Sequence, residues 1–200
     1  MATPDLNERF SRQVILPSVG MAGQKKWESS TVLLAGEGVT LQAAQKALES
    51  TGLSKIIVVD SPPSQLSSFS LAIVVTEKTD LRREISRQLR AQSKPTLFAW
   101  PSGSGYSLFL AKHQNGQCPC MECFEVMNPK AFAQGAPTMQ RILGAMAASE
   151  ALLWILNEQS PLEGRVWINS LEEGTSFRHE VRSSPKCPAL LLDEGVVVTP

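Results

Sequence analysis

The chain has 200 residues, of which 42% are hydrophobic, and its 19 basic and 19 acidic side chains give a formal net charge of zero. This length and composition predict one compact domain, and the absence of a Lys/Arg cluster argues against nucleic acid or an anionic membrane surface as a partner. No apolar run approaches the length that spans a bilayer, and the polar start mixes acids and bases, so we expect a cytoplasmic protein that binds no membrane.

The first 30 residues are expected to form an N-terminal arm. They hold an apolar run at Val14–Leu16, followed by Pro17 and two glycines that should break any regular element. Gln24–Ser29 is expected to be a short helix. Taken alone, this arm would cap the domain or a partner.

The stretch from Thr31 to Asp60 predicts a strand-helix-strand unit. Two short apolar runs, Val32–Ala35 and Ile56–Val59, enclose an amphipathic segment from Leu41 to Thr51. Apolar runs of this length, separated by a helical period with glycine at each end, are typical of parallel strands that are buried on both faces.

The turn after the first strand, Gly36-Glu37-Gly38, has two of the three glycines of a dinucleotide-binding turn, and Leu41 takes the third place. Asp60 stands where an acid would bind a ribose hydroxyl. These residues alone leave a simpler interpretation open, in which the glycines only make a turn and Asp60 caps the next loop.

The rest of the chain predicts further strands and helices. The expected elements are a strand at Leu71–Thr76, a helix at Asp80–Ala91, a strand at Pro95–Trp100, an antiparallel strand within Gly103–Lys112, an irregular segment at Phe124–Pro137, a long apolar helix at Met139–Asn157, and a hairpin of Gly164–Ile168 with Thr175–Val181. Small residues in the long helix would permit close packing on a sheet or on a second subunit. The last residues, Leu190–Pro200, would add an edge strand or stay mobile.

Three of the four cysteines, Cys118, Cys120 and Cys123, lie within six residues, and Cys187 follows much later. In a chain without a signal peptide, this grouping is more typical of a metal site than of a disulfide framework.

Two long stretches resemble the ThiF/MoeB/HesA family, the bacterial relatives of ubiquitin-activating enzymes. They are RFSRQVILPSVGMAGQKKWESSTVLLAGEG, which starts at Arg9, and LAIVVTEKTDLRREIS, which starts at Leu71. The resemblance extends from residue 8 to about residue 190. It implies an α/β fold: a Rossmann-like, mostly parallel sheet flanked by helices, with an antiparallel C-terminal extension. We expect one domain over residues 1–200, with the arm at 1–30, a shortened core at 31–100, the extension with the cysteine cluster and long helix at 101–190, and a tail at 191–200.

The resemblance also implies a reaction and a site. The family adenylates the C-terminal glycine of a ubiquitin-like or sulfur-carrier protein with Mg-ATP, and it works as a dimer. By resemblance, Arg12 reaches across the dimer to the ATP phosphates, Glu77 takes the place of the aspartate that binds magnesium, and Gly36, Gly38 and Asp60 belong to the nucleotide site. The alternative for Arg12 is a surface ion pair.

The catalytic motifs depart from the family pattern. Val39 and Leu41 replace glycines, Glu37 adds a negative charge, and Lys78 takes the place of an asparagine and would compete with magnesium for Glu77. The family's phosphate-binding segment has no counterpart in Ser61–Ser70, which is also too short for a normal helical crossover. The sheet is therefore expected to lack at least one strand and one helix of the family fold, and ATP and magnesium are doubtful ligands.

By resemblance, Cys120 and Cys123 form the first half of a structural zinc site, and Cys187 is what remains of the second pair. Tetrahedral zinc needs four ligands, so we expect Cys118 to supply the fourth. His113 or water could substitute for it, and the alternative is a group of reduced thiols that hold no metal.

Three functions remain open. The first is a non-catalytic or partner-dependent subunit that forms a homodimer, or a heterodimer with a ThiF-like homologue, and that binds a sulfur-carrier or ubiquitin-like protein. The second is an active adenylyltransferase, and the third is a metal- or redox-handling protein with an exposed reactive thiol. Since no fifth cysteine exists, thioester chemistry within this chain is not expected.

Overall fold

The computed structural model describes residues 9–61, 68–102, 104–112, 119–127, 135–184 and 187. In this part of the chain, seven strands form one sheet in the order β2-β1-β3-β4-β5-β6-β7. The first four are parallel and the last three antiparallel. Their bounds are β1 Thr31–Ala35, β2 Lys55–Val59, β3 Leu71–Val74, β4 Thr96–Ser102, β5 Gly105–Ala111, β6 Arg165–Ser170 and β7 Thr175–Glu180. The predicted fold class is therefore confirmed.

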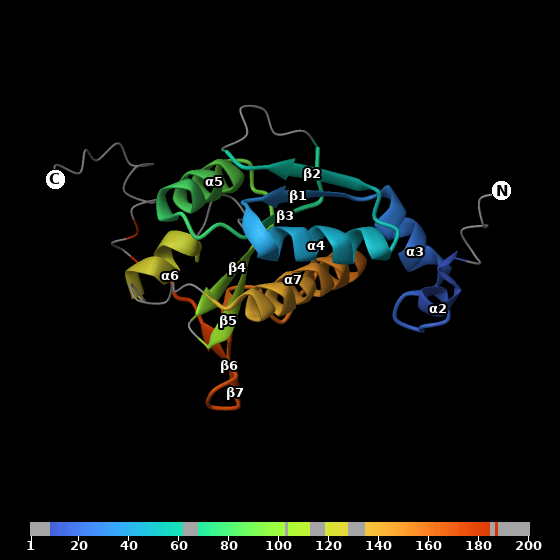
Figure 1. Cartoon of the computed structure of the whole chain (residues 1–200). Coiled ribbons are helices and arrows are strands. Elements are labelled where there is room, and N and C mark those ends of the chain that lie inside the picture. The colour runs from blue at the N-terminus through green and yellow to red at the C-terminus, as the bar shows by residue number, and fades with distance from the viewer. Residues whose placement is uncertain are drawn as a thin grey trace.

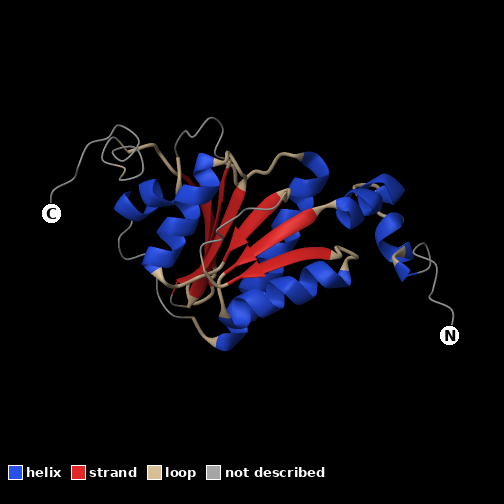
Figure 2. Ribbon diagram, turned by 90° about the horizontal axis from the view of Figure 1, so that it is seen from above, coloured by secondary structure: helices blue, strands red, loops and turns tan. Residues whose placement is uncertain are grey.

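Helices cover both faces of this sheet (Figures 1 and 2). One face carries α3 (Gly20–Ser29), α4 (Gly38–Ser50) and α7 (Pro137–Asn157). The other face carries α5 (Thr79–Ala91) and α6 (Met121–Met127). A short helix, α2 (Ser11–Val14), precedes α3.

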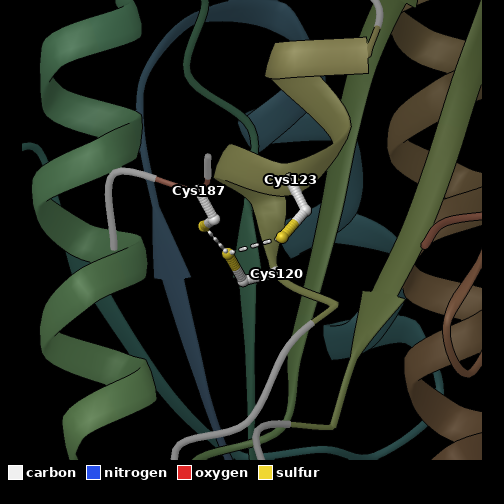
Figure 3. Close-up of side chains that lie close together, drawn as sticks. All are labelled: Cys120, Cys123 and Cys187. Atoms are coloured by element: carbon white, nitrogen blue, oxygen red, sulfur yellow. Dashed lines mark hydrogen bonds between the residues drawn. The ribbon is translucent and has the colours of Figure 1, made fainter. Parts of the chain in front are cut away.

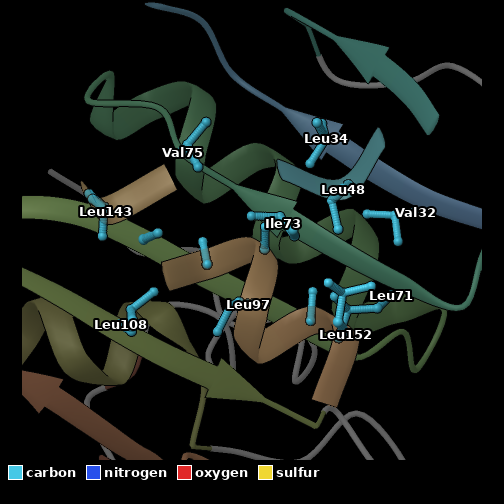
Figure 4. Packing of buried hydrophobic residues seen from close by; sticks show 14 of the residues in the cluster. Val32, Leu34, Leu48, Leu71, Ile73, Val75, Leu97, Leu108, Leu143 and Leu152 are labelled. Carbon is cyan, nitrogen blue, oxygen red and sulfur yellow. The ribbon is translucent and has the colours of Figure 1, made fainter. Parts of the chain in front are cut away.

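Successive strand residues supply two separate cores because side chains alternate between the faces of a sheet. Val32 and Ile73 point to the α4/α7 face, where they pack with Leu48 and Leu152 (Figure 4). Leu33, which follows Val32 in β1, belongs instead to the cluster under α5 and α6. Burial on both faces explains why these strands read as continuous apolar runs.

The long helix α7 packs tightly against α4 at Gly144. A Cβ atom added to Gly144 would lie 2.4 Å from the carbonyl oxygen of Thr40 and 2.8 Å from the backbone nitrogen of Ala44. Gly144 therefore serves close packing against another helix of this chain, whereas the sequence analysis had considered a sheet or a second subunit as the surface for such packing.

Gly144→Ala is expected to lower the free energy of unfolding by about 1 to 3 kcal/mol, because the new methyl group would collide with backbone atoms of α4. This sign is opposite to that of a Gly→Ala change in an unobstructed helix, which usually stabilises. Ala145→Ser is the control, since it also adds one heavy atom but on the exposed face of α7. Urea denaturation of both variants measures the difference, and equal stabilities would contradict the tight contact.

Three expectations about local structure were wrong. The two glycines of the arm do not break the chain, since α3 begins at Gly20 and includes Gly23, whose missing side chain makes room for Leu156 of α7. Part of the segment expected to be irregular forms α6, which ends at Met127. Finally, α7 is long and apolar enough to span a bilayer by length and composition alone, although it lies on the sheet, with residues such as Leu143 in the core.

The strand β2 lies at one edge of the sheet, and β3 pairs on the opposite side of β1. Ser61 and Ser68–Ser70, the described residues of the connection, hold no helix, and residues 62–67 lie outside the described part. The side chain of Val58 is 47% exposed. This arrangement fits the expected loss of a strand and a helix next to β2.

Candidate nucleotide and metal sites

The glycine turn after β1 keeps the shape of an anion-binding turn. Gly36 has a φ of +133°, and a Cβ atom there would lie 3.0 Å from the backbone nitrogen of Thr76, so β1 and the segment after β3 approach too closely for a side chain. Gly38 begins α4 with a φ of +83°, and no atom lies within 4 Å of its Cβ position. The N-cap residue Glu37 makes no side-chain capping hydrogen bond to the first amides of α4, and uncapped amides at a helix N-terminus suit an anion.

Val39 and Leu41, which replace glycines of the family pattern, lie on different faces of α4. Leu41 is 7% exposed and packs in the core between α4 and the sheet. Val39 is half-buried on the outer face of α4. The reason is helical geometry: successive positions along a helix lie about 100° apart around its axis, so positions 39 and 41 fall on different faces of α4.

Glu37, in the middle of the turn, forms an ion pair with Lys78. The Nζ atom of Lys78 lies 2.8 Å from Oε1 of Glu37. Lys78 therefore engages Glu37, and its expected competition with magnesium for Glu77 stays a prediction. The pair lowers the negative charge at the turn, but both side chains are more than half exposed, so water and salt screen it.

The other predicted residues of the nucleotide site are exposed. Glu77 follows β3 and accepts a hydrogen bond of 3.4 Å from Nε2 of Gln140, and Asp60 follows β2. Both stand at the carboxyl ends of the parallel strands, together with the glycine turn. Arg12 lies in α2 at the opposite end of α4 from this turn (Figure 1), so its part in a site remains a prediction.

The structure brings three of the four cysteines together (Figure 3). Cys120 precedes α6, Cys123 lies within it, and Cys187 comes from the distant C-terminal segment. The Sγ atom of Cys120 lies 3.8 Å from that of Cys123 and 3.5 Å from that of Cys187. All three side chains are at most 1% exposed.

This geometry fits a zinc ion. Sulfur ligands at about 2.3 Å in a tetrahedron lie about 3.8 Å from one another, which is close to the separations observed. The three Sγ atoms all lie within 4.8 Å of one another, so one ion can reach them all. Cys118, the expected fourth ligand, and the substitute His113 lie outside the described residues, so the complete ligand set stays a prediction.

A network of charged residues that the sequence analysis missed holds the cysteine-bearing helix in place. Arg87 of α5 donates two hydrogen bonds, of 2.7 and 3.1 Å, to the carboxylate of Glu122 in α6. Arg82 and Arg83 both pair with Glu125, at 2.9 and 2.6 Å. The side chains of Arg82 and Glu125 are 1% and 6% exposed, so this ion pair is buried.

The surroundings of these arginines shift their ionisation in opposite directions. Burial lowers the pKa of Arg82, and the negative charge of Glu125 and the hydrogen bond that Arg82 donates to it oppose that shift. The hydrogen bond with Glu122 raises the pKa of Arg87, against partial burial. The spacing of Arg83 and Arg87 on one helix was the available signal, because residues four apart share a helix face.

Comparison with known proteins places this fold and these sites in context. No family model matches the chain. Protein HesA, heterocyst, from Trichormus variabilis is 35% identical over 75 residues, which are 38% of this chain and 28% of that protein. The adenylyltransferase and sulfurtransferase MOCS3 from Oryza sativa subsp. japonica is 24% identical over 93% of this chain and 49% of the rice protein. The chain thus spans about half or less of the length of these curated relatives.

The alignment with the rice protein covers 228 positions, more than the whole length of this chain, so the rice protein carries additional residues inside the matched region. Among solved structures, E. coli MccB has a TM-score of 0.72 at 13% identity, covering 92% of this chain and 72% of MccB. A heterocyclase in complex with substrate and cofactor has a TM-score of 0.64 at 20% identity, covering 94% of this chain and 29% of the enzyme. The chain is therefore related to the ThiF/MoeB family of adenylyltransferases, and its partial, distant matches fit a shortened member.

Proposed function

We propose that this chain is a non-catalytic or partner-dependent ThiF-like subunit that binds a homologous adenylyltransferase, a sulfur-carrier protein, or both. One observation carries the proposal: the first two cations after β3, Lys78 and Arg82, are both paired with carboxylates of this chain, Glu37 and Glu125. A triphosphate needs cations that are available to it, since its charge must be neutralised in the site.

The missing chain segment supports the same proposal. The connection from β2 to β3 has no room for the phosphate-binding residues that the family places there, and the rice relative has additional residues within the matched region. Glu77 keeps a carboxylate that could hold magnesium, but without phosphates on the other side of the ion the protein offers few ligands, because Mg²⁺ in such sites relies on substrate oxygens.

Features of the arm support a role at a partner's site. Arg12 is exposed and lies far from the glycine turn of its own chain. Ile15 and Leu16, next to it, are 76% and 49% exposed, and adjacent exposed apolar side chains of this size often mark a protein contact. The arm therefore suits a dimer in which Arg12 contacts the phosphates bound by the partner.

Zinc, in this proposal, has a structural role. A bound ion would join α6 to the C-terminal segment through Cys120, Cys123 and Cys187. The burial of these three side chains argues against the redox alternative, since a reactive thiol needs access to solvent.

An active adenylyltransferase remains the second candidate because of the turn itself. The space above Gly38 is open, and Asp60 is exposed at the position where a ribose would lie. These features would accommodate a nucleotide that is bound with few contacts to its phosphates.

The proposal is tested by ATP–pyrophosphate exchange with a catalytically complete ThiF-like homologue from the same organism and its carrier protein. This chain alone should show no exchange, and its addition should raise the homologue's rate. Arg12→Ala should remove most of that gain, about a hundredfold if the guanidinium stabilises charge on the phosphates. Lys25→Ala, which removes another exposed cation near the arm, should keep it. A rate that does not respond to this chain would contradict partner dependence.

A further inference from the structure

The helices α4 and α7 lie side by side (Figure 1), and residues of both line a groove. Its volume is about 500 Å³, which is in the range of ligand sites in proteins. We call it the α4/α7 groove, and its lining residues are Val39, Gln42, Ala43, Lys46, Ala47, Ser50 and Arg141.

The floor of the α4/α7 groove is apolar and rigid. Val39, Ala43 and Ala47 follow one another at intervals of four residues, so they share one face of α4. Beside them, Gly144 places α7 in close contact with α4, with Ala43 only 2.7 Å from its added Cβ position. Since this contact fixes the two helices relative to each other, the shape of the floor is preformed.

The charged side chains that line the groove are both positive. Lys46 comes from α4 and Arg141 from α7, both are exposed, and no carboxylate of the described residues pairs with either. Among the residues that the structure describes, no acidic side chain lines the groove. Glu49, the acid nearest to Lys46 along α4, accepts a hydrogen bond from Gln45 and lines a separate groove with Arg9.

We propose that the α4/α7 groove binds an acidic peptide segment of a protein partner. An apolar side chain of the segment lies on Val39, Ala43 and Ala47, and neighbouring carboxylates meet Lys46 and Arg141. Charge complementarity selects this occupant, since a free phosphate would leave the apolar floor uncovered and two cations are too few to hold a membrane surface. This site goes beyond the proposed function and does not depend on the nucleotide site.

The probe for the test is a fluorescein-labelled peptide, Asp-Glu-Leu-Leu-Glu-Asp-Glu, with its neutral counterpart Asn-Gln-Leu-Leu-Gln-Asn-Gln. In fluorescence anisotropy, the acidic peptide should bind and the neutral one should not. Lys46→Glu and Arg141→Glu should each weaken binding about tenfold, and Lys25→Glu, the matched control on α3, should change it less than about twofold. NMR titration should move the amide signals of Val39–Ser50 and Arg141.

Three outcomes would overturn the proposal. They are equal binding of the two peptides, equal effects of Lys25→Glu and Lys46→Glu on binding, and peptide-induced changes in NMR amide signals only outside the α4/α7 groove. Analytical ultracentrifugation tests whether the groove is instead an interface between two copies of this chain. If Lys46→Glu dissociates a dimer in the absence of peptide, the groove is an interface between two copies of this chain and the peptide proposal is wrong. Because Lys46 and Arg141 lie on different helices and both are exposed, a folding defect in one variant leaves the other as the test.

Discussion

Cys123→Ser is expected to remove the zinc that we propose for the cysteine cluster and to destabilise the protein strongly. Structural zinc stabilises the fold through its binding free energy, which is on the order of 10 kcal/mol in small zinc domains, and losing one thiolate forfeits much of it. Elemental analysis of the purified protein should give about one zinc per chain before the change and far less after it. A chelator should lower the melting temperature of the native protein towards that of the variant, and thermal unfolding with and without the chelator measures this change.

Two controls make the zinc prediction specific. Met121→Leu changes another fully buried side chain of α6, close to the cluster, and should keep the zinc. Cys118→Ser tests the fourth ligand, and an unchanged zinc content would remove Cys118 from the site. Native protein that contains no zinc, and whose melting temperature does not respond to a chelator, would contradict the metal assignment as a whole.

Glu125→Ala is expected to lower the free energy of unfolding by about 3 to 5 kcal/mol. The change leaves the guanidinium of Arg82 buried without the carboxylate of Glu125. The hydrogen bonds that Arg82 donates to the carbonyl oxygen of Thr76 and to the hydroxyl of Thr79 remain. A buried charge that loses its counter-ion bears the full cost of desolvation, whereas the intact pair offsets it. Denaturant unfolding measures the loss.

Arg83→Ala is the matched control for Glu125. It removes the other partner of the same carboxylate, but the side chain of Arg83 is 42% exposed, so we expect a loss of at most about 1 kcal/mol. The double change Arg82→Met with Glu125→Leu should recover much of the stability lost in Glu125→Ala, because it removes both charges. If the double variant is as unstable as the single one, packing rather than charge accounts for the effect.

The fold was predictable from the sequence where its signal is local. Buried parallel strands such as Val32–Ala35 read as apolar runs, and the helix at residues 79–91 shows its period through Leu81, Ile85 and Leu89. The helix α6 escaped prediction because its seven residues hold few turns and the surrounding prolines and cysteines suggest a loop. A short helix is held by tertiary contacts, here the ion pairs of Glu122 and Glu125, and these cannot be read from the segment itself.

Two local features near the candidate sites were predictable from the sequence, but the pairings between their residues were not. Gly36 and Gly38 adopt the positive φ angles that their positions require, and Cys120, Cys123 and Cys187 meet in space. The direction of Leu41 into the core and the pairing of Glu37 with Lys78 depend on how helices and strand ends face one another, because the residues that meet lie more than forty positions apart in the sequence. Such contacts arise from the assembled fold, and a motif defined by spacing does not contain them.

Calorimetry with Mg-ATP on the isolated protein tests the central claim most directly, since the claim is that the cations beside the glycine turn are engaged by the chain's own carboxylates. We expect no saturable binding below about 1 mM, a concentration that corresponds to about 4 kcal/mol of binding free energy. Glu37→Gln, which frees Lys78, should strengthen binding relative to the native chain. Native protein that binds Mg-ATP with a micromolar dissociation constant would contradict the account.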